Sequence, residues 1–189
     1  MVMTAMLAAV SAVLMFFNFA VPFMPGFIKM DFSELPALIA AFTMGPWQGV
    51  LVCLVKNLVN LPFTNTAGVG EISNFLLGCF LVIPAGYLHK YKASYPRAIL
   101  GSLIGAGCMA AVGVLSNYFV VYPLYAKILI PMEAILGMYQ TLLPSVENLW
   151  QALLIFNLPF TFGKGLCSAL VAILLYKPLA PIIRGHALD

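Results

Sequence analysis

Lys164 lies in an apolar stretch of the sequence that is long enough to cross a lipid bilayer, where a charged side chain is costly. The local sequence is "FTFGKGL", preceded by "LLIFNLP" and followed by "CSALVAILLY". A charge at the centre of a membrane helix costs at least about 2.5–3.5 kcal/mol, so such residues mark functional sites by default. The residues one turn earlier, Phe160 and Thr161, offer no acidic partner. We therefore expect the Lys164 ammonium to face an interior cavity and to donate hydrogen bonds to a ligand.

Lys56 is a second candidate at membrane depth. It belongs to the sequence "VKNLVN", in which Lys56 and Asn60 stand four residues apart and share one face of a helix. That helix face must be in contact with protein or water rather than with lipid. The alternative for both lysines is a side chain that extends along its helix and places the charge at the membrane surface. Two acidic residues, Glu71 and Glu147, lie near expected loop boundaries.

Polar amides are expected at the same level of the bundle as Lys164. Asn117, in "LSNYFVVYPLY", lies near the end of its apolar segment, and Asn74 follows the polar loop "AGVGEIS". A buried amide needs several hydrogen-bond partners. Together with Thr161, these side chains predict an apolar-lined pocket with a few convergent donors and acceptors. Such a pocket suits a flat, neutral, hydroxylated small molecule, whereas an ion path needs rings of charge or carbonyl groups.

The composition shows which class of protein must position these side chains. The chain has 189 residues, of which 63% are hydrophobic and 8% are charged, and its mean hydropathy is +1.04. Soluble domains are about 45–50% apolar and about 25% charged. The apolar runs are continuous rather than alternating, which indicates membrane-spanning helices and not a barrel. The net charge of +3 is small and scattered along the chain, so nucleic acid is not expected as a partner.

The apolar segments predict a single domain, residues 1–189, that is an all-α integral membrane protein. Apolar runs cover about residues 4–23, 36–61, 72–88, 98–122 and 149–176, and a linker with several prolines covers residues 123–148. Gly45-Pro46 is a poor helix interior and divides the second run, which gives six transmembrane helices. Basic residues mark cytoplasmic loops, so the loop from Lys90 to Arg97 and the basic C-terminus place both termini in the cytoplasm. An undivided second run would give five spans and an external N-terminus.

No catalytic motif is found in the sequence. "FTFGKG" lacks the Ser or Thr that follows the lysine of a phosphate-binding loop, and no paired-carboxylate, H-E-x-x-H or G-x-S-x-G arrangement occurs. The four cysteines stand singly in apolar segments, without metal-ligand spacing. We therefore expect neither an enzyme, nor a metal site, nor a resident cofactor.

The sequence resembles the riboflavin-specific S components (RibU type) of energy-coupling factor (ECF) transporters, the vitamin-uptake systems of prokaryotes. The resemblance rests on "MDFSELPALIAAFTMGPWQG", "LVKNLVN", "ISNFLLG", "SNYFVVYPLY" and "PFTFGKG", which follow the family's order and spacing across essentially the whole chain. It implies a six-helix protein of the plasma membrane that captures riboflavin from outside and hydrolyses nothing itself. It also implies three partner subunits, a transmembrane T component and two ATP-binding-cassette (ABC) ATPases.

The resemblance implies roles for individual residues as well. The family's ligand-binding positions fall on Asn117, Lys164 and, in the first loop, Phe27, Ile28 and Met30. That loop would close over the flavin. Thr161 stands where the family has Asn, in the pattern Pro-Phe-Asn-x-x-Lys, and it can still donate and accept one hydrogen bond.

Small residues in the first apolar segment imply a docking face for the T component. In "AMLAAVSA", Ala5 and Ala9 stand four residues apart, with Ala8 and Ala12 one face over. Small residues at this spacing also let neighbouring helices approach closely, so packing within the bundle remains the alternative.

Two other functions stay open at this point. One is an S component for a different vitamin or precursor, which the departure at Thr161 favours. The other is an ion-coupled secondary carrier, which needs a coupling-ion site at a helix break near the bilayer midplane. The acidic candidates for such a site, Glu71 and Glu147, stand near loop boundaries instead.

Overall fold

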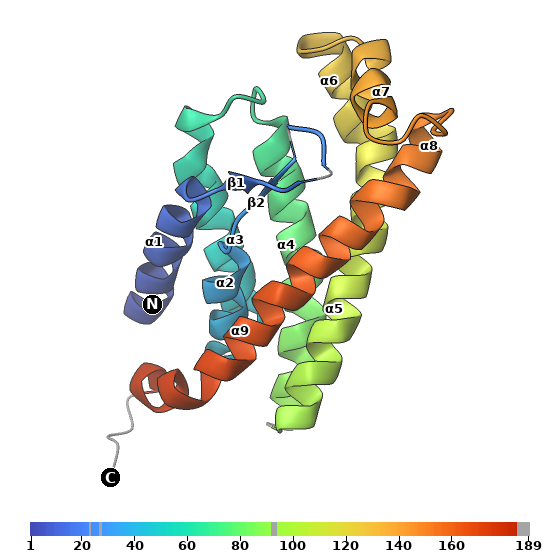
Figure 1. The fold of residues 1–189 in the computed structure, drawn as a ribbon. Helices are drawn as coiled ribbons and strands as arrows, with labels where there is room; N and C mark the ends of the chain where they lie inside the picture. Colours follow the sequence, from blue (N-terminus) through green and yellow to red (C-terminus); the bar gives the residue numbers. More distant parts are fainter. Residues whose placement is uncertain (23, 27, 92–93, 185–189) are drawn as a thin grey trace.

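The computed structural model describes residues 1–22, 24–26, 28–91 and 94–184, and it shows a bundle of helices with one short strand pair (Figure 1). The elements are α1 (Val2–Phe16), β1 (Phe19–Ala20), β2 (Lys29–Met30), α2 (Glu34–Met44), α3 (Pro46–Asn60), the 3-10 turn η1 (Leu61–Phe63), α4 (Val69–Tyr91), α5 (Tyr95–Ser116), η2 (Asn117–Val121), α6 (Tyr122–Ile128), α7 (Met132–Gln140), α8 (Leu149–Ala152), η3 (Leu153–Asn157) and α9 (Leu158–Arg184). Both η2 and η3 are π-helical segments, and they join α5 to α6 and α8 to α9. The strands β1 and β2 pair antiparallel.

Gly45 separates α2 from α3, as the Gly45-Pro46 pair predicts. Its φ of 107° is a left-handed value that residues other than glycine rarely adopt. Pro46 occupies the first turn of α3, where its missing N–H is not needed for the helix. The apolar run of residues 36–61 is therefore two helices rather than one.

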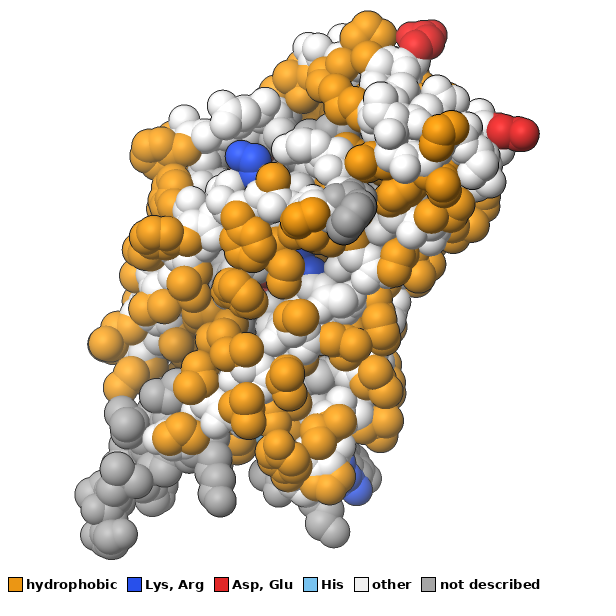
Figure 2. Space-filling view, in the orientation of Figure 1, with side chains coloured by type: hydrophobic (Ala, Val, Ile, Leu, Met, Phe, Trp, Pro, Cys, Tyr) orange, Lys and Arg blue, Asp and Glu red, His pale blue; other side chains and the backbone are white. Residues whose placement is uncertain are grey.

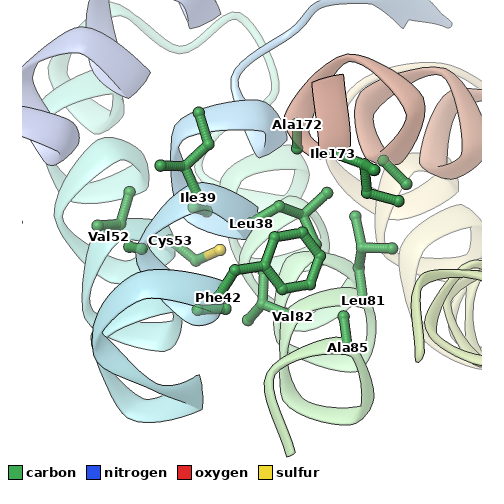
Figure 3. Close-up of a cluster of buried hydrophobic side chains, with 14 of the residues drawn as sticks. Leu38, Ile39, Phe42, Val52, Cys53, Leu81, Val82, Ala85, Ala172 and Ile173 are labelled. Atoms are coloured by element: carbon green, nitrogen blue, oxygen red, sulfur yellow. The ribbon is translucent and has the colours of Figure 1, made fainter. Parts of the chain in front are cut away.

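The central helix of the bundle is α2, which contacts α1, α3, α4 and α9. Every residue from Ala37 to Phe42 is buried, so α2 is covered around its whole circumference. Figure 3 shows Leu38, Ile39 and Phe42 among side chains of the neighbouring helices. This 11-residue helix is thus surrounded by protein on all sides, and its N-terminus is held deep inside the molecule.

Three helical segments among the described residues are long and apolar enough to cross a membrane, namely 69–90, 95–128 and 149–176. The helices α1 and α2 are shorter apolar helices. Figure 2 shows hydrophobic side chains over most of one face, with acidic side chains conspicuous at the end that carries α7 and α8. Large apolar side chains such as Val10, Leu103 and Leu170 are exposed. An apolar surface of this extent indicates contact with lipid.

Residues 123–148 contain more regular structure than a proline-rich linker predicts. The helix continues through η2 into α6 and ends at Ile128, beyond the predicted end at Tyr122, and α7 follows. Pro123 lies in the first turn of α6, and Pro131 directly precedes α7, so both occupy positions that helices tolerate. Buried side chains hold these helices on the bundle, and they are Val114, Val121, Tyr122, Ile135, Tyr139, Val146, Ala152 and Leu153.

Candidate ligand-binding site

A cavity of about 160 Å³ lies at the end of the bundle that carries α6 and α7, and we call it the polar cavity. Its lining residues are Ile28, Lys29, Gly70, Ser73, Asn74, Leu77, Met109, Asn117, Val121, Tyr122, Tyr125, Asn157, Phe160, Thr161 and Lys164. Of the residues predicted to bind a ligand, Asn74, Asn117, Thr161, Lys164 and Ile28 lie on this wall. The structure therefore brings together side chains that are up to 136 residues apart in the sequence, from Ile28 to Lys164.

Of the other predicted residues of the first loop, one is not on this wall and one cannot be placed. Met30 is half-buried in β2, where it pairs with Phe19 of β1. Phe27 lies outside the described residues. The loop reaches the cavity through Ile28 and Lys29.

The Lys164 ammonium forms an ion pair with acids that precede or begin α2. Its Nζ lies 2.9 Å from Asp31 Oδ2 and 3.4 Å from Glu34 Oε1. Glu34 Oε1 also lies 3.2 Å from Lys56 Nζ, which donates a hydrogen bond to the Ser33 hydroxyl at 2.5 Å. We call the four ionised residues the charge cluster; all of them are buried. Two cations and two anions neutralise one another there, which is the condition under which charges are tolerated inside a protein.

These contacts contradict the alternative in which the lysine side chains extend to the membrane surface. Lys56 is fully buried and Lys164 nearly so, and both ammonium groups point at acids inside the bundle. The helix of Lys164 offers no acidic neighbour, as the sequence indicates. The partner, Asp31, comes instead from a segment 133 residues earlier in the chain.

Lys164 belongs to the charge cluster and also to the wall of the polar cavity. An ammonium group has three N–H donors. One of them donates to Asp31 at 2.9 Å and the ammonium is also paired with Glu34 at 3.4 Å, which leaves at least one donor for a ligand. Because the cluster as a whole is neutral, the cavity offers a strong donor without a net charge. This combination favours a neutral ligand that carries an acceptor oxygen or nitrogen.

Asn74 and Thr161 add neutral hydrogen-bonding groups to the same wall. The Asn74 side-chain oxygen is buried and has no hydrogen-bond partner among the described residues. A buried acceptor without a partner costs about 1–3 kcal/mol, so this oxygen is well placed to accept a hydrogen bond from a ligand. Thr161 is buried beside Gly113 of α5, where its hydroxyl and methyl groups would be in van der Waals contact with a Cβ at that position.

Three buried side chains form a closed ring of hydrogen bonds at the cavity, which we call the Tyr–Tyr–Asn ring. The hydroxyls of Tyr122 and Tyr139 lie 2.6 Å apart. Tyr139 donates to Asn157 Oδ1 at 2.6 Å, and Asn157 Nδ2 donates to the Tyr122 hydroxyl at 3.0 Å. Tyr122 and Asn157 line the polar cavity, whereas Tyr139 lies behind them on α7.

The two π-helical segments position the polar residues of this wall. The segment η2 begins at Asn117 and ends directly before Tyr122, and η3 ends at Asn157. A π turn inserts one extra residue into a helix, so it changes the direction in which the following side chains point. Such turns are rare in proteins overall, and those that do occur are often found at functional sites. Two of them on one cavity therefore support its assignment as the ligand site.

Sequence reasoning does not single out Asp31, Glu34, Tyr122 or Asn157 as site residues. The two acids belong to a charged stretch that the sequence places in a loop, and Tyr122 resembles an aromatic residue of the membrane interface. Of these four residues, only Asn157 has a sequence feature that could identify it as a site residue. It stands inside the apolar run "LLIFNLP", so the argument made for Asn117 applies to it as well.

The small residues of α1 divide between two faces. Ala8 and Ala12 are buried against the bundle, whereas Ala5 and Ala9 are exposed. The exposed pair borders an apolar groove of about 600 Å³ between α1 and α3, lined by Met1, Thr4, Ala5, Ala8, Ala9, Ala12, Val13, Phe16, Leu51, Val55 and Val59. Close packing inside the bundle thus accounts for Ala8 and Ala12 but not for Ala5 and Ala9.

Glu71 is engaged by neutral donors at the start of α4. Its carboxylate accepts hydrogen bonds from Thr64 at 2.7 Å, Thr66 at 3.1 Å and Asn60 at 3.3 Å, while Glu147 is exposed. These contacts tie the loop after α3 to the first turn of α4. Within the described ranges, no group of three or more His, Cys, Asp or Glu side chains is placed to hold a metal ion.

Comparisons with known proteins extend over almost the whole chain. Residues 1–176 match the family described as "ECF transporter, substrate-specific component". The "Riboflavin transporter RibU" of Staphylococcus aureus (strain TCH60) is 37% identical over 180 residues, which cover 95% of this chain and 89% of the relative. The "Riboflavin transporter FmnP" of Bacillus subtilis (strain 168) is 30% identical over 187 residues, which cover 97% and 93%.

The fold has a counterpart among solved structures. The solved structure described as "Structure and mechanism of the S component of a bacterial ECF transporter" is similar to this chain, with a TM-score of 0.74 and 35% sequence identity. The match covers 97% of this chain and 96% of the solved chain. The family consists of transporter components and not of enzymes, in agreement with the prediction from the missing catalytic motifs. This chain therefore belongs to the substrate-specific (S) components of ECF transporters, which are multi-pass proteins of the bacterial membrane.

Proposed function

We propose that this S component binds riboflavin and delivers it into the cell together with a T component and two ABC ATPases. The relatives that match nearly the whole chain are named riboflavin transporters. The observation that carries the proposal is the polar cavity, where Lys164, Asn74 and Asn117 stand among apolar side chains. Riboflavin suits this chemistry, because its flat, neutral ring system carries carbonyl and nitrogen acceptors and its ribityl chain carries hydroxyl groups.

The proposal includes an arrangement of the single domain in the membrane. Six spans are assigned to α1, α2, α3, α4, α5 with α6, and α9, with both termini in the cytoplasm. The basic residues Lys90 and Arg97 lie at the end of α4 and the start of α5, and the polar cavity lies toward the other ends of these helices. Since basic residues favour the cytoplasmic side, the cavity then opens toward the outside of the cell.

Riboflavin requires more room than the cavity has in this conformation. Ligand pockets occupy about 300–1,000 Å³, whereas the polar cavity has about 160 Å³. Among the described residues, the segment that carries Ile28 and Lys29 is paired only through β1 and β2, which are two residues long each. We therefore assign the widening of the cavity to an outward movement of this segment, which then closes over the bound ring.

The groove between α1 and α3 is assigned to the T component. Ala5 and Ala9 leave an apolar surface without large side chains on the exposed face of α1. A helix of a partner subunit can approach such a surface closely, which is how small residues four apart promote helix association in membranes.

A second candidate function is an S component for a different vitamin or precursor. Thr161 favours it, because the side chain is shorter than the Asn that the similar riboflavin-binding pattern has at this position. An ion-coupled carrier has less support, since the Glu71 carboxylate is engaged by Thr64 and Thr66 at a loop and Glu147 is exposed.

The test is the visible absorption spectrum of the detergent-purified chain, followed by titration with riboflavin and detection of quenched flavin fluorescence. The proposal predicts a yellow protein, or one that quenches added riboflavin at one equivalent. Uptake into cells should further depend on the T component and the ATPases. A protein that ignores riboflavin but binds another vitamin would support the second candidate, and uptake without any ATPase would support a carrier.

A further inference from the structure

Tyr139 has an unusual position relative to the polar cavity. It lies on α7, is fully buried and does not line the cavity, yet its hydroxyl contacts Tyr122 and Asn157, which both do. Two of the three contacts of the Tyr–Tyr–Asn ring are short, at 2.6 Å each, and the third has an ordinary length of 3.0 Å. Tyr139 therefore touches the site from behind, through two side chains that face the ligand.

The ring restricts Asn157 more than a single hydrogen bond would. Because Asn157 Nδ2 can only donate and Oδ1 can only accept, the three hydrogen bonds run in one direction, from Asn157 to Tyr122, from Tyr122 to Tyr139 and from Tyr139 back to Asn157. The ring uses one N–H and one oxygen lone pair of the Asn157 amide. The second N–H and the second lone pair remain available, and the plane of the amide is held in place. The Tyr122 hydroxyl, by contrast, donates its only proton to Tyr139 within the ring.

The surroundings of the ring make its contacts strong. Ile135, Val146 and Leu153 are buried in the same apolar cluster as Tyr139. Hydrogen bonds in such a water-poor environment reinforce one another, and leaving one partner without its bond costs about 1–3 kcal/mol. Asn157 is also the last residue of η3, and Tyr122 directly follows η2, so the ring joins both π-helical segments to α7.

We propose that Asn157 is a ligand-contacting residue of this S component and that Tyr139 is a positioning residue, which fixes the Asn157 amide and the Tyr122 ring against the ligand. This inference rests on the proposed riboflavin function. The remaining N–H and lone pair of Asn157 suit a neutral heteroaromatic ligand that carries carbonyl and N–H groups. Tyr139 contributes to affinity only through Asn157 and Tyr122, because other side chains stand between it and the cavity.

The test is a double-mutant cycle on riboflavin affinity, measured by fluorescence quenching with the detergent-purified full chain. The variants are Tyr139→Phe, Asn157→Ala and the combination of both. Loss of one neutral hydrogen bond predicts a roughly 2–10-fold weaker Kd for Tyr139→Phe, and loss of the amide predicts a roughly 10–100-fold weaker Kd for Asn157→Ala. The combined loss should fall clearly short of the product of the two single losses, because Asn157, one of the two groups that Tyr139 positions, is then absent.

Tyr118→Phe is the matched control. Tyr118 is a half-buried residue of η2, does not line the polar cavity, and packs edge-on against Trp150 with ring centroids 5.2 Å apart. Its Kd should stay within about twofold of the unmodified chain, a change within the typical net contribution of one hydrogen bond. The melting temperature of each ligand-free variant separates a loss of affinity from a loss of folding. Should Tyr139→Phe not fold, Tyr122→Phe opens the same ring from its other hydroxyl, and the cycle with Asn157→Ala is run with that variant.

The possible results separate a failure of this inference from a failure of the proposed function. Losses that multiply in the combined variant, or an unchanged Kd with a lower melting temperature in Tyr139→Phe, would mean that Tyr139 only stabilises the fold, and the inference is overturned. If the unmodified chain and Asn157→Ala bind riboflavin equally well, this inference is overturned and the proposed function remains intact. An unmodified chain that does not bind riboflavin overturns both.

Discussion

Replacement of Lys164 by alanine should damage affinity and stability for separate reasons. The variant removes the donor that faces the polar cavity, which is worth about 1.5–3 kcal/mol for a hydrogen bond from a charged group. That value corresponds to a roughly 10–150-fold weaker Kd for riboflavin. The variant also leaves Asp31 and Glu34 buried with Lys56 as the remaining cation of the charge cluster. Breaking a buried ion pair by removing one partner costs about 3–5 kcal/mol of stability.

A second substitution separates the two effects. Asp31→Asn in the Lys164→Ala background removes the uncompensated negative charge, so Glu34 and Lys56 again form a neutral pair. Most of the lost stability should return, while the affinity should not, since the cavity donor is still missing. The measurements are thermal unfolding of the ligand-free protein in detergent and riboflavin titration of each variant. Lys127→Ala, at an exposed lysine of α6, is the control and should change neither quantity.

Two results would refute this reasoning. Unchanged riboflavin affinity in Lys164→Ala, with the protein folded, would show that Lys164 is only a counter-ion for Asp31 and Glu34. No recovery of stability in the Asp31→Asn combination would show that the buried negative charge is not the origin of the loss. The affinity and the melting temperature are measured on the same preparations, so each outcome applies to one part of the argument.

Three further outcomes are expected. Lys56→Met should lower the melting temperature, because Glu34 loses a cation at 3.2 Å. The same variant should change riboflavin affinity less than Lys164→Ala does, since Lys56 does not line the polar cavity. Gly105→Ala should cost about 1–3 kcal/mol of stability in a denaturant titration, because a Cβ there would overlap the carbonyl oxygen of Leu81. Ala9→Leu should leave riboflavin binding unchanged and abolish uptake, because it fills the groove between α1 and α3; normal uptake would exclude this groove as the docking face.

The helix break and part of the site follow from the sequence for identifiable physical reasons. Gly45-Pro46 is predictable, because a left-handed φ followed by a residue without an N–H is incompatible with a helix interior. Lys164, Asn117 and Asn74 can be placed at one level, because a polar group in an apolar run must turn toward protein. These are local properties, and the sequence shows them directly.

The remaining features depend on contacts between distant segments. Asp31 pairs with a lysine 133 residues away, and no periodicity in either segment indicates that contact. The π-helical segments η2 and η3 have no sequence signature of their own, so the inward position of Tyr122, which directly follows η2, is not predictable from helical spacing. The helix α7 is hidden for a similar reason, because Pro131 looks like a helix breaker until its position at the start of the helix is known.

The neutrality of the charge cluster has an electrical consequence. A single elementary charge that moves across the whole membrane potential gains or loses about 2.3 kcal/mol per 100 mV. Asp31, Glu34, Lys56 and Lys164 sum to zero and are in direct contact, so moving them together through the field does almost no electrical work. Capture and release of a neutral vitamin at this site should therefore be insensitive to the voltage across the cell membrane, whatever path the site takes through it.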